Sequence, residues 1–211
     1  MIKSMKNKLI ISLILFISLV SILTSAFAST DEAGLFCTSD LTNSYGSLTL
    51  GLANTGMQGL GFTITAYNTS VNSRTTVMNY INSSGNNYGF YLKCHANSSL
   101  LAIVSGNSSS YIYPSDISGN WHFVFLDGCS TAASSNFASA FHTVGYSSRG
   151  FLGWYTTVYT DKAYAFSQVF WNQVGTNTVR DAALTAAASV PGSGTTPIKY
   201  YGDTSYHGWA W

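Results

Sequence analysis

The sequence predicts an α/β sandwich in which helices flank a mostly parallel central sheet, and three observations indicate this class. Apolar, strand-like segments alternate with segments of helical periodicity over most of the chain. Segment 121–127 is apolar on both faces, as expected of a central strand that is covered on each side. The chain has 211 residues, which is long enough for one domain with a substantial core.

The first half of the chain is expected to be mainly β-structure. An irregular, Ser/Thr-rich start is followed by predicted strands at 48–52, 62–67 and 88–95, a turn at 56–61, a helix at 70–81, and a hairpin of 100–104 with 111–113. Alternation of apolar and polar residues indicates the strands. Ser70 is the expected N-cap of the helix, and Gly85 is its expected stop.

The second half is expected to alternate strands with helices. The predicted elements are strands at 121–127, 150–158 and 198–201, helices at 132–142, 161–174 and 178–190, and a loop at 191–197. Thr178 and Asp181 resemble a capping box at the start of the last helix. This order of elements is typical of a parallel sheet with crossover helices.

The first 28 residues have the pattern of a secretory signal peptide. Three lysines lie within residues 1–8, an apolar run covers 9–23, and Ala26-Phe27-Ala28 supplies a small-x-small cleavage site. An uncleaved anchor is the alternative, because residues 9–28 match the ~20 residues of a bilayer span. We expect residues 1–28 to be removed and residues 29–211 to form a single secreted domain that has no membrane segment.

The charge of the chain argues against nucleic acid as a partner. Loss of the three leader lysines from a total of nine leaves six basic against eight acidic side chains. A surface without Lys/Arg clusters has no electrostatic footprint for a phosphate backbone. It also has no basic stripe that would bind a membrane surface.

Three cysteines, Cys37, Cys94 and Cys129, remain in a compartment that permits disulfides, so at least one thiol is left over. One bridge with a buried spare thiol and one cysteine kept free for chemistry are both compatible with this count. Cys94 is placed for core burial or for a bridge to Cys37.

A histidine and a cysteine follow two successive apolar strands. The strand at 88–95 ends in Cys94-His95-Ala96, and the strand at 121–127 continues into Gly128-Cys129. Ligands of open parallel sheets bind at the carboxyl ends of the strands, so both side chains are expected to reach one cleft. A buried structural cysteine beside an unrelated histidine is the alternative.

The residue types in these turns suit nucleophilic catalysis. A helix expected after Cys129 would favour its thiolate through the positive N-terminal end of the helix dipole. His95 would act on that thiol, and the backbone N–H groups of Cys129 and of the turn after His95 would hold an oxyanion. Gly128 is expected to permit a sharp turn and an open approach.

The remaining histidines fit structural roles. His122 begins the strand that leads to Cys129, which puts it on the order of 20 Å from that residue. His142 and His207 are expected at a helix end and in the C-terminal tail. No Cys-x-x-Cys or His-x-x-x-His pair is present, so we expect neither a metal nor a cofactor.

The stretches 90–97 (FYLKCHAN) and 123–130 (FVFLDGCS) resemble the caspase-like cysteine peptidases, a group that includes caspases, legumains, clostripain and gingipains. In that family an apolar strand ends in His-Gly, and a later one ends in Ala-Cys or Gly-Cys. The segments 151–154, 169–171 and 178–188 and the Tyr201-Gly202-Asp203 sequence are also similar. The resemblance covers roughly residues 61–203.

The resemblance implies a three-layer caspase-like sandwich with peptidase activity. His95 would be the general base or orienting group, and Cys129 the nucleophile that forms a thioester. The backbone N–H groups of Ala96 and Cys129 would form the oxyanion hole. Ala96 replaces the family glycine, which could narrow that hole. Family specificity pockets often use an acidic residue, for which Asp127, Asp161 and Asp203 are available here without an assignment.

Two functions follow as hypotheses. The first is a secreted caspase-like cysteine endopeptidase that hydrolyses peptide or protein substrates with His95 and Cys129. The alternative is a non-catalytic caspase-like module that binds a protein or polysaccharide through exposed aromatic rings, such as those of residues 206–211. A secreted, β-rich structural protein is a third idea, suggested by the Ser/Thr/Asn content.

Overall fold

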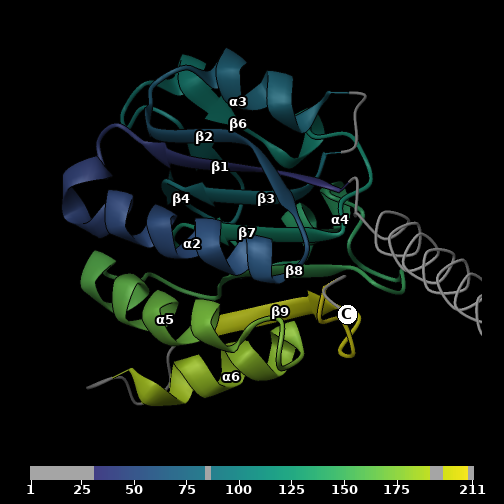
Figure 1. Cartoon of the computed structure of the whole chain (residues 1–211). Coiled ribbons are helices and arrows are strands. Elements are labelled where there is room, and N and C mark those ends of the chain that lie inside the picture. The colour runs from purple at the N-terminus through teal and green to yellow at the C-terminus, as the bar shows by residue number, and fades with distance from the viewer. Residues whose placement is uncertain (1–30, 84–86, 191–196, 209–211) are drawn as a thin grey trace, which may run out of the picture. The chain divides into compact units, whose positions relative to one another are not determined.

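A computed structural model describes residues 31–83, 87–190 and 197–208 of the chain. The predicted signal peptide at 1–28 and the expected helix stop Gly85 lie outside these residues. The described residues form a main sheet of six strands, shown side by side in Figure 1. Their order is β2 (Thr63–Val71), β1 (Glu32–Thr38), β3 (Asn87–Lys93), β7 (Phe123–Asp127), β8 (Gly150–Trp154) and β9 (Ile198–Gly202).

Every neighbouring pair in this sheet is parallel except β8 and β9, which are antiparallel. Strands β7 and β8 are buried along their whole length, which explains why their sequences are apolar on both faces. The mostly parallel α/β architecture expected from the sequence is therefore confirmed. Because these strands are parallel, β1, β3, β7 and β8 all end at the same edge of the sheet.

Two hydrophobic clusters cover the two faces of the sheet. Helices α2 (Ser47–Gly59), α5 (Thr160–Gln173) and α6 (Val179–Ser189) pack on one face, against Phe123 and Phe125 of β7. Helices α3 (Arg74–Ile81) and α4 (Asn136–Ala140) pack on the other face, with Val124 and Leu126 of the same strand. Successive residues of β7 thus point to opposite faces, and the sheet is the middle of three layers.

A small antiparallel sheet lies beside the end of β3. Its strands are β4 (His95–Ala96), β5 (Leu101–Ala102) and β6 (Tyr111–Ile112). The hairpin predicted at 100–104 and 111–113 is confirmed. The structure adds β4 to this hairpin. The residues that follow Cys94 are therefore held by the hydrogen bonds of a β-ladder and do not form a free loop.

Three predictions near the N-terminus are wrong. Residues 48–52, expected as a strand, belong to α2, because Leu50, Ala53 and Met57 form one buried helical face while Leu48 is exposed. The turn expected at 56–61 begins only at Leu60, four residues late, for the same reason. The region expected to be irregular contains β1, a central strand whose short apolar run was too weak a signal.

Several boundaries also differ from prediction. Helix α3 starts after Ser73, whose hydroxyl accepts a hydrogen bond from the Thr76 N–H, so Ser70 is not its N-cap. Strand β8 ends at Trp154, four residues early. The predicted cap Thr178 is confirmed, with its hydroxyl accepting from the Asp181 N–H at 3.1 Å. Among the described residues, no helix is both long and apolar enough to cross a bilayer.

Candidate active site

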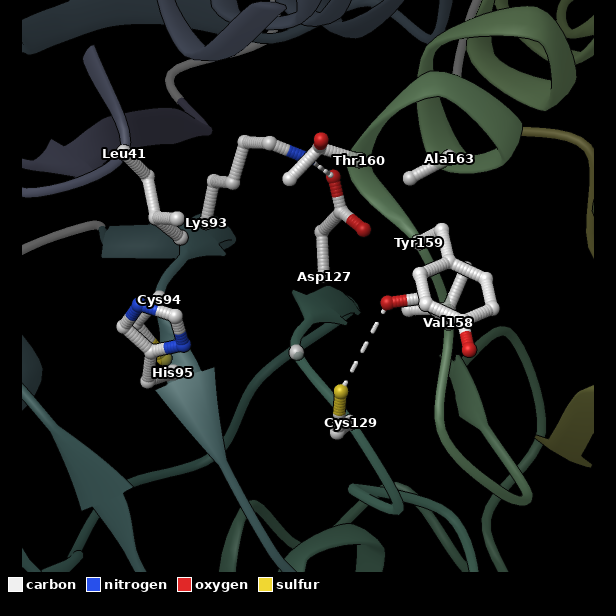
Figure 2. Close-up of a pocket in the computed structure, with 11 residues that line it drawn as sticks. Leu41, Lys93, Cys94, His95, Asp127, Cys129, Val158, Tyr159, Thr160 and Ala163 are labelled. Carbon is white, nitrogen blue, oxygen red and sulfur yellow. Dashed lines mark hydrogen bonds and ion pairs between the residues drawn. The ribbon is translucent and has the colours of Figure 1, made fainter. Parts of the chain in front are cut away.

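A pocket of about 240 Å³ lies at the carboxyl edge of the main sheet. Residues that follow β1, β3, β7 and β8 line it, because parallel strands deliver their ends to one edge. The start of α5 forms one of its walls, with Thr160 and Ala163. Figure 2 shows the side chains that surround it.

Both predicted catalytic residues line this pocket. Figure 2 shows the His95 ring and the Cys129 sulfur at its edge. The His95 side chain is 51% exposed, and Cys129 is half-buried. The thiol donates to the Val158 carbonyl at 3.6 Å, whereas His95 Nε2 lies 3.7 Å from Asp40 Oδ2. The fold therefore brings the two groups to one pocket, where each contacts a different partner and no hydrogen bond among the described residues joins them.

The turn that carries Cys129 is held by side-chain contacts rather than by a helix. The helix expected at 132–142 is reduced to the five residues of α4, which begins at Asn136, so the predicted helix-dipole effect on Cys129 is wrong. Ser130 has a left-handed backbone, with φ of 59°. Buried Thr131 donates to the carbonyls of Leu126 and Gly128 and accepts from the Trp154 N–H. This network fixes the loop beside the thiol.

The backbone N–H groups of the two predicted oxyanion donors, Cys129 and Ala96, are not used in the hydrogen bonds given for the turn and for the β4–β5 ladder. Within the described part of the chain, no acceptor pairs with the Cys129 N–H. The Asn97 N–H donates to the Leu100 carbonyl. Since hydrogen-bonded and non-hydrogen-bonded pairs alternate along an antiparallel ladder, the adjacent pair Ala96↔Leu101 is non-hydrogen-bonded, and the Ala96 N–H points away from β5.

Ala96, which stands where caspase-like peptidases have glycine, does not line the pocket with either its methyl group or its backbone. It packs against Gly128 instead. A Cβ atom placed on Gly128 would lie 2.8 Å from the Ala96 Cβ and 2.7 Å from the Cys94 carbonyl oxygen. Gly128 is therefore required for close contact between the two turns.

A buried ion pair lies across the pocket from Cys129 (Figure 2). Lys93 and Asp127 are register partners at the ends of β3 and β7, and Lys93 Nζ lies 2.8 Å from Asp127 Oδ2. Tyr91 donates to the same oxygen, and the Trp154 indole donates to Oδ1. Burial and the Asp127 carboxylate raise the pKa of Tyr91 well above its ordinary value, so this phenol remains a donor.

Four residues at or beside the pocket were not predicted from the sequence: Asp40, Lys93, Val158 and Tyr159. Asp40 follows β1, a strand that the sequence pattern did not reveal. Lys93 was passed over as a polar residue within an apolar strand, although a lysine in a segment buried on both faces indicates a buried partner. Val158 was assigned to a strand, whereas it lies in the loop before α5.

The other histidines lie away from the pocket, as expected. His122 Nδ1 is 2.8 Å from Asp31, and its ring stacks on Tyr88. His142 Nδ1 lies 2.6 Å from the Gly119 carbonyl. Neither lines the pocket, and His207 does not line it either.

The acidic candidates and the remaining cysteines have structural positions. Asp161 lies in the first turn of α5, and Asp203 accepts from Ser148 and Ser205 in a turn. Cys37 and Cys94 are free thiols that belong to the clusters on opposite faces of the sheet, which rules out a bridge between them in this fold.

The comparisons with known proteins leave the chain without an assigned family. No protein-family model matches it, and no curated protein matches its sequence. Among the described residues, no three His, Cys, Asp or Glu side chains are grouped in a way that could hold a metal ion.

Proposed function

We propose that this protein is a secreted cysteine endopeptidase of the caspase-like type, with Cys129 as the nucleophile and His95 as its base. The observation that carries the proposal is that two adjacent parallel strands, β3 and β7, present the imidazole and the thiol to one pocket. The three-layer architecture around a mostly parallel sheet agrees with the resemblance of segments 90–97 and 123–130 to that family.

The chemistry assigns a role to each group. His95 takes the thiol proton while the Cys129 sulfur bonds to the substrate carbonyl carbon, and the carbonyl electron pair moves to oxygen. The N–H group of Cys129 stabilises that oxyanion, whereas Ala96, the second donor expected from the sequence, does not line the pocket. Collapse breaks the C–N bond, and the amine leaves with the proton from His95. Water then hydrolyses the thioester and restores the thiol. Asp40, beside Nε2, positions the ring.

Selective labelling and loss of cleavage test the proposal. Burial raises the pKa of Cys37 to about 11 and that of Cys94 well above its ordinary value, so an acylating probe on folded, reduced protein is expected to label Cys129. Cleavage of a mixed peptide library is expected to vanish in Cys129→Ala and to fall by at least ~10²-fold in His95→Ala. His142→Gln is the matched histidine control and should keep full activity.

Folded protein that neither labels at position 129 nor cleaves any peptide would overturn the peptidase proposal. Binding of a protein or polysaccharide by such inactive protein would instead favour the non-catalytic module. Of the rings expected to serve that alternative at 206–211, Tyr206 is buried, and residues 209–211 lie outside the described part of the chain. Exposed rings elsewhere include Tyr159 at the pocket and Tyr45, which stacks on Tyr164.

A further inference from the structure

The buried pair Lys93–Asp127 is part of the pocket wall, although neither group takes part in the proposed chemistry. The side chains are 2% and 0% exposed, respectively. Figure 2 shows their charged ends meeting across the pocket from Cys129 and His95. A substrate residue whose carbonyl is attacked by Cys129 would therefore direct its side chain toward this pair.

The carboxylate of Asp127 is already occupied. One oxygen accepts from both the Tyr91 hydroxyl and Lys93 Nζ, at 2.7 and 2.8 Å, and the other accepts from the Trp154 indole at 2.7 Å. Both carboxylate oxygens of Asp127 are thus hydrogen-bonded, and its negative charge is neutralised by the Lys93 ammonium. The carboxylate therefore does not attract a cationic substrate side chain. Lys93 fills the place that a substrate lysine or arginine would take.

The ammonium of Lys93, in contrast, has unused hydrogen-bonding capacity. It carries three N–H donors, and within the described residues Asp127 is its acceptor. Further acceptors stabilise a buried ammonium, so an oxygen atom that enters the pocket beside Lys93 Nζ can accept a charge-assisted hydrogen bond from it.

The start of helix α5, which also lines the pocket (Figure 2), has the same preference. Helix α5, of 14 residues, begins at Thr160, and no side chain caps its N-terminus from the N-cap residue Tyr159. Its first N–H groups and the positive end of its dipole favour an oxygen with negative charge nearby, although Asp161 in the first turn already supplies one carboxylate at this end. Lys93 and the α5 terminus thus both supply donors to one cavity.

We propose that Lys93 determines the substrate specificity of this site: it excludes lysine and arginine side chains and selects a residue that ends in a carboxylate or carboxamide oxygen. The proposal rests on the peptidase function proposed above. It differs from the resemblance-based expectation of an acidic residue that binds a basic side chain, because here the chain's own lysine already neutralises that acid.

Peptides that differ at the residue before the cleaved bond test the proposal directly. We expect wild-type kcat/KM for Asp, Asn, Glu or Gln at that position to exceed the value for Lys or Arg by roughly tenfold or more, the effect of one charge-assisted hydrogen bond. Within this set, Asp against Asn and Glu against Gln show whether charge or the carbonyl oxygen is recognised. Equal rates for all residues, or a preference for Lys or Arg, would overturn the proposal.

A specificity switch is the sharper test. In Lys93→Ala, the Asp127 carboxylate loses its paired cation, and the pocket becomes larger by the volume of the lysine side chain. Peptides with Lys before the cleaved bond should therefore become the preferred substrates. The double variant Lys93→Ala/Asp127→Asn is the matched control and should gain no preference for Lys. Cleavage by folded Lys93→Ala with the wild-type profile would contradict the role of Lys93.

Binding measurements separate this inference from the proposed function. Indole fluorescence of the Cys129→Ala variant, titrated with the same uncleaved peptides, reports occupancy of the pocket because Trp154 contacts Asp127. Tighter binding of Asp or Asn peptides than of Lys peptides supports the inference even if wild-type protein cleaves nothing. Cleavage without side-chain preference would instead leave the peptidase proposal intact and overturn this one.

Discussion

The carboxylate of Asp40 is held between two strand ends. The buried Thr38 hydroxyl donates to its Oδ1 at 2.5 Å, while its Oδ2 faces His95 Nε2 at 3.7 Å. A carboxylate in this position stabilises the imidazolium that forms when the thiol gives up its proton, and it restrains the ring. In the proposed mechanism, Asp40 therefore serves as a positioning residue that acts through His95.

Substitution of Asp40 by asparagine should lower kcat with little change in KM. The amide keeps the shape of the side chain but loses the charge, so we expect kcat to fall roughly 10- to 100-fold, a part of the ~10²- to 10⁴-fold contribution of general acid–base catalysis. Steady-state kinetics with one peptide substrate measure both constants. Asp116→Asn, which changes a carboxylate paired with Arg74, is the control. A rise in KM at unchanged kcat would show that Asp40 only shapes the pocket.

The sequence allowed prediction of the two turns that bring His95 and Cys129 to one pocket, because each turn is local. Strands at 88–95 and 121–127 carry a continuous apolar signal, and His95 and Cys129 follow them directly. Asp40 and Lys93 were not predictable in the same way. The role of Asp40 depends on pairing of β1 between β2 and β3, and that of Lys93 depends on its register with Asp127, both of which are long-range contacts.

At the scale of elements, the mispredictions have a common physical cause. Residues 48–52 alternate with period two, yet the buried positions of α2 are spaced by three and four residues, so tertiary packing decided between two compatible patterns. The first turns of the helix expected after Cys129 do not form, because the Thr131 hydroxyl donates to the carbonyls of Leu126 and Gly128. Side-chain capture of backbone groups competes with helix formation there.

Contact between the β3 and β7 turns makes Gly128 sensitive to any side chain. Gly128→Ala would place a Cβ atom 2.7 Å from the Cys94 carbonyl oxygen, so the turns must separate. We expect a loss of roughly 1–3 kcal/mol in the free energy of unfolding, as for other overpacked sites, together with lower activity. Urea denaturation followed by tryptophan fluorescence measures the change.

Gly51→Ala is the matched control for that substitution. Gly51 lies inside α2, and nothing is within 4 Å of the Cβ atom it would gain. This variant should be more stable than wild type by about 1 kcal/mol or slightly less, because alanine favours a helix interior over glycine. Equal stability of the two variants would contradict the tight contact at Gly128.

At the scale of the whole molecule, the sheet separates two apolar cores and buries titratable groups between its layers. Cys37 and Tyr91 lie in the core beneath α2 and α5, and Tyr206 reaches the same core from the C-terminal segment. Burial raises the pKa of all three, to about 11 for Cys37 and well above the ordinary value for the two tyrosines. Each group is therefore neutral in the folded protein at a pH where the unfolded chain begins to ionise.

Stability should consequently fall at alkaline pH. A group whose pKa is raised on folding contributes fully below its unfolded value, here 9.0 for Cys37, and loses the contribution as pH rises toward about 11. The free energy of unfolding should be nearly constant from pH 7 to 8.5 and then decline, with a slope of at most about 1.4 kcal/mol per pH unit for each proton released. Urea titrations in the presence of a thiol reductant measure this slope, and Cys37→Ala should reduce it between pH 9 and 11. Stability that holds or rises over that interval would show that these groups are accessible to water in the folded protein.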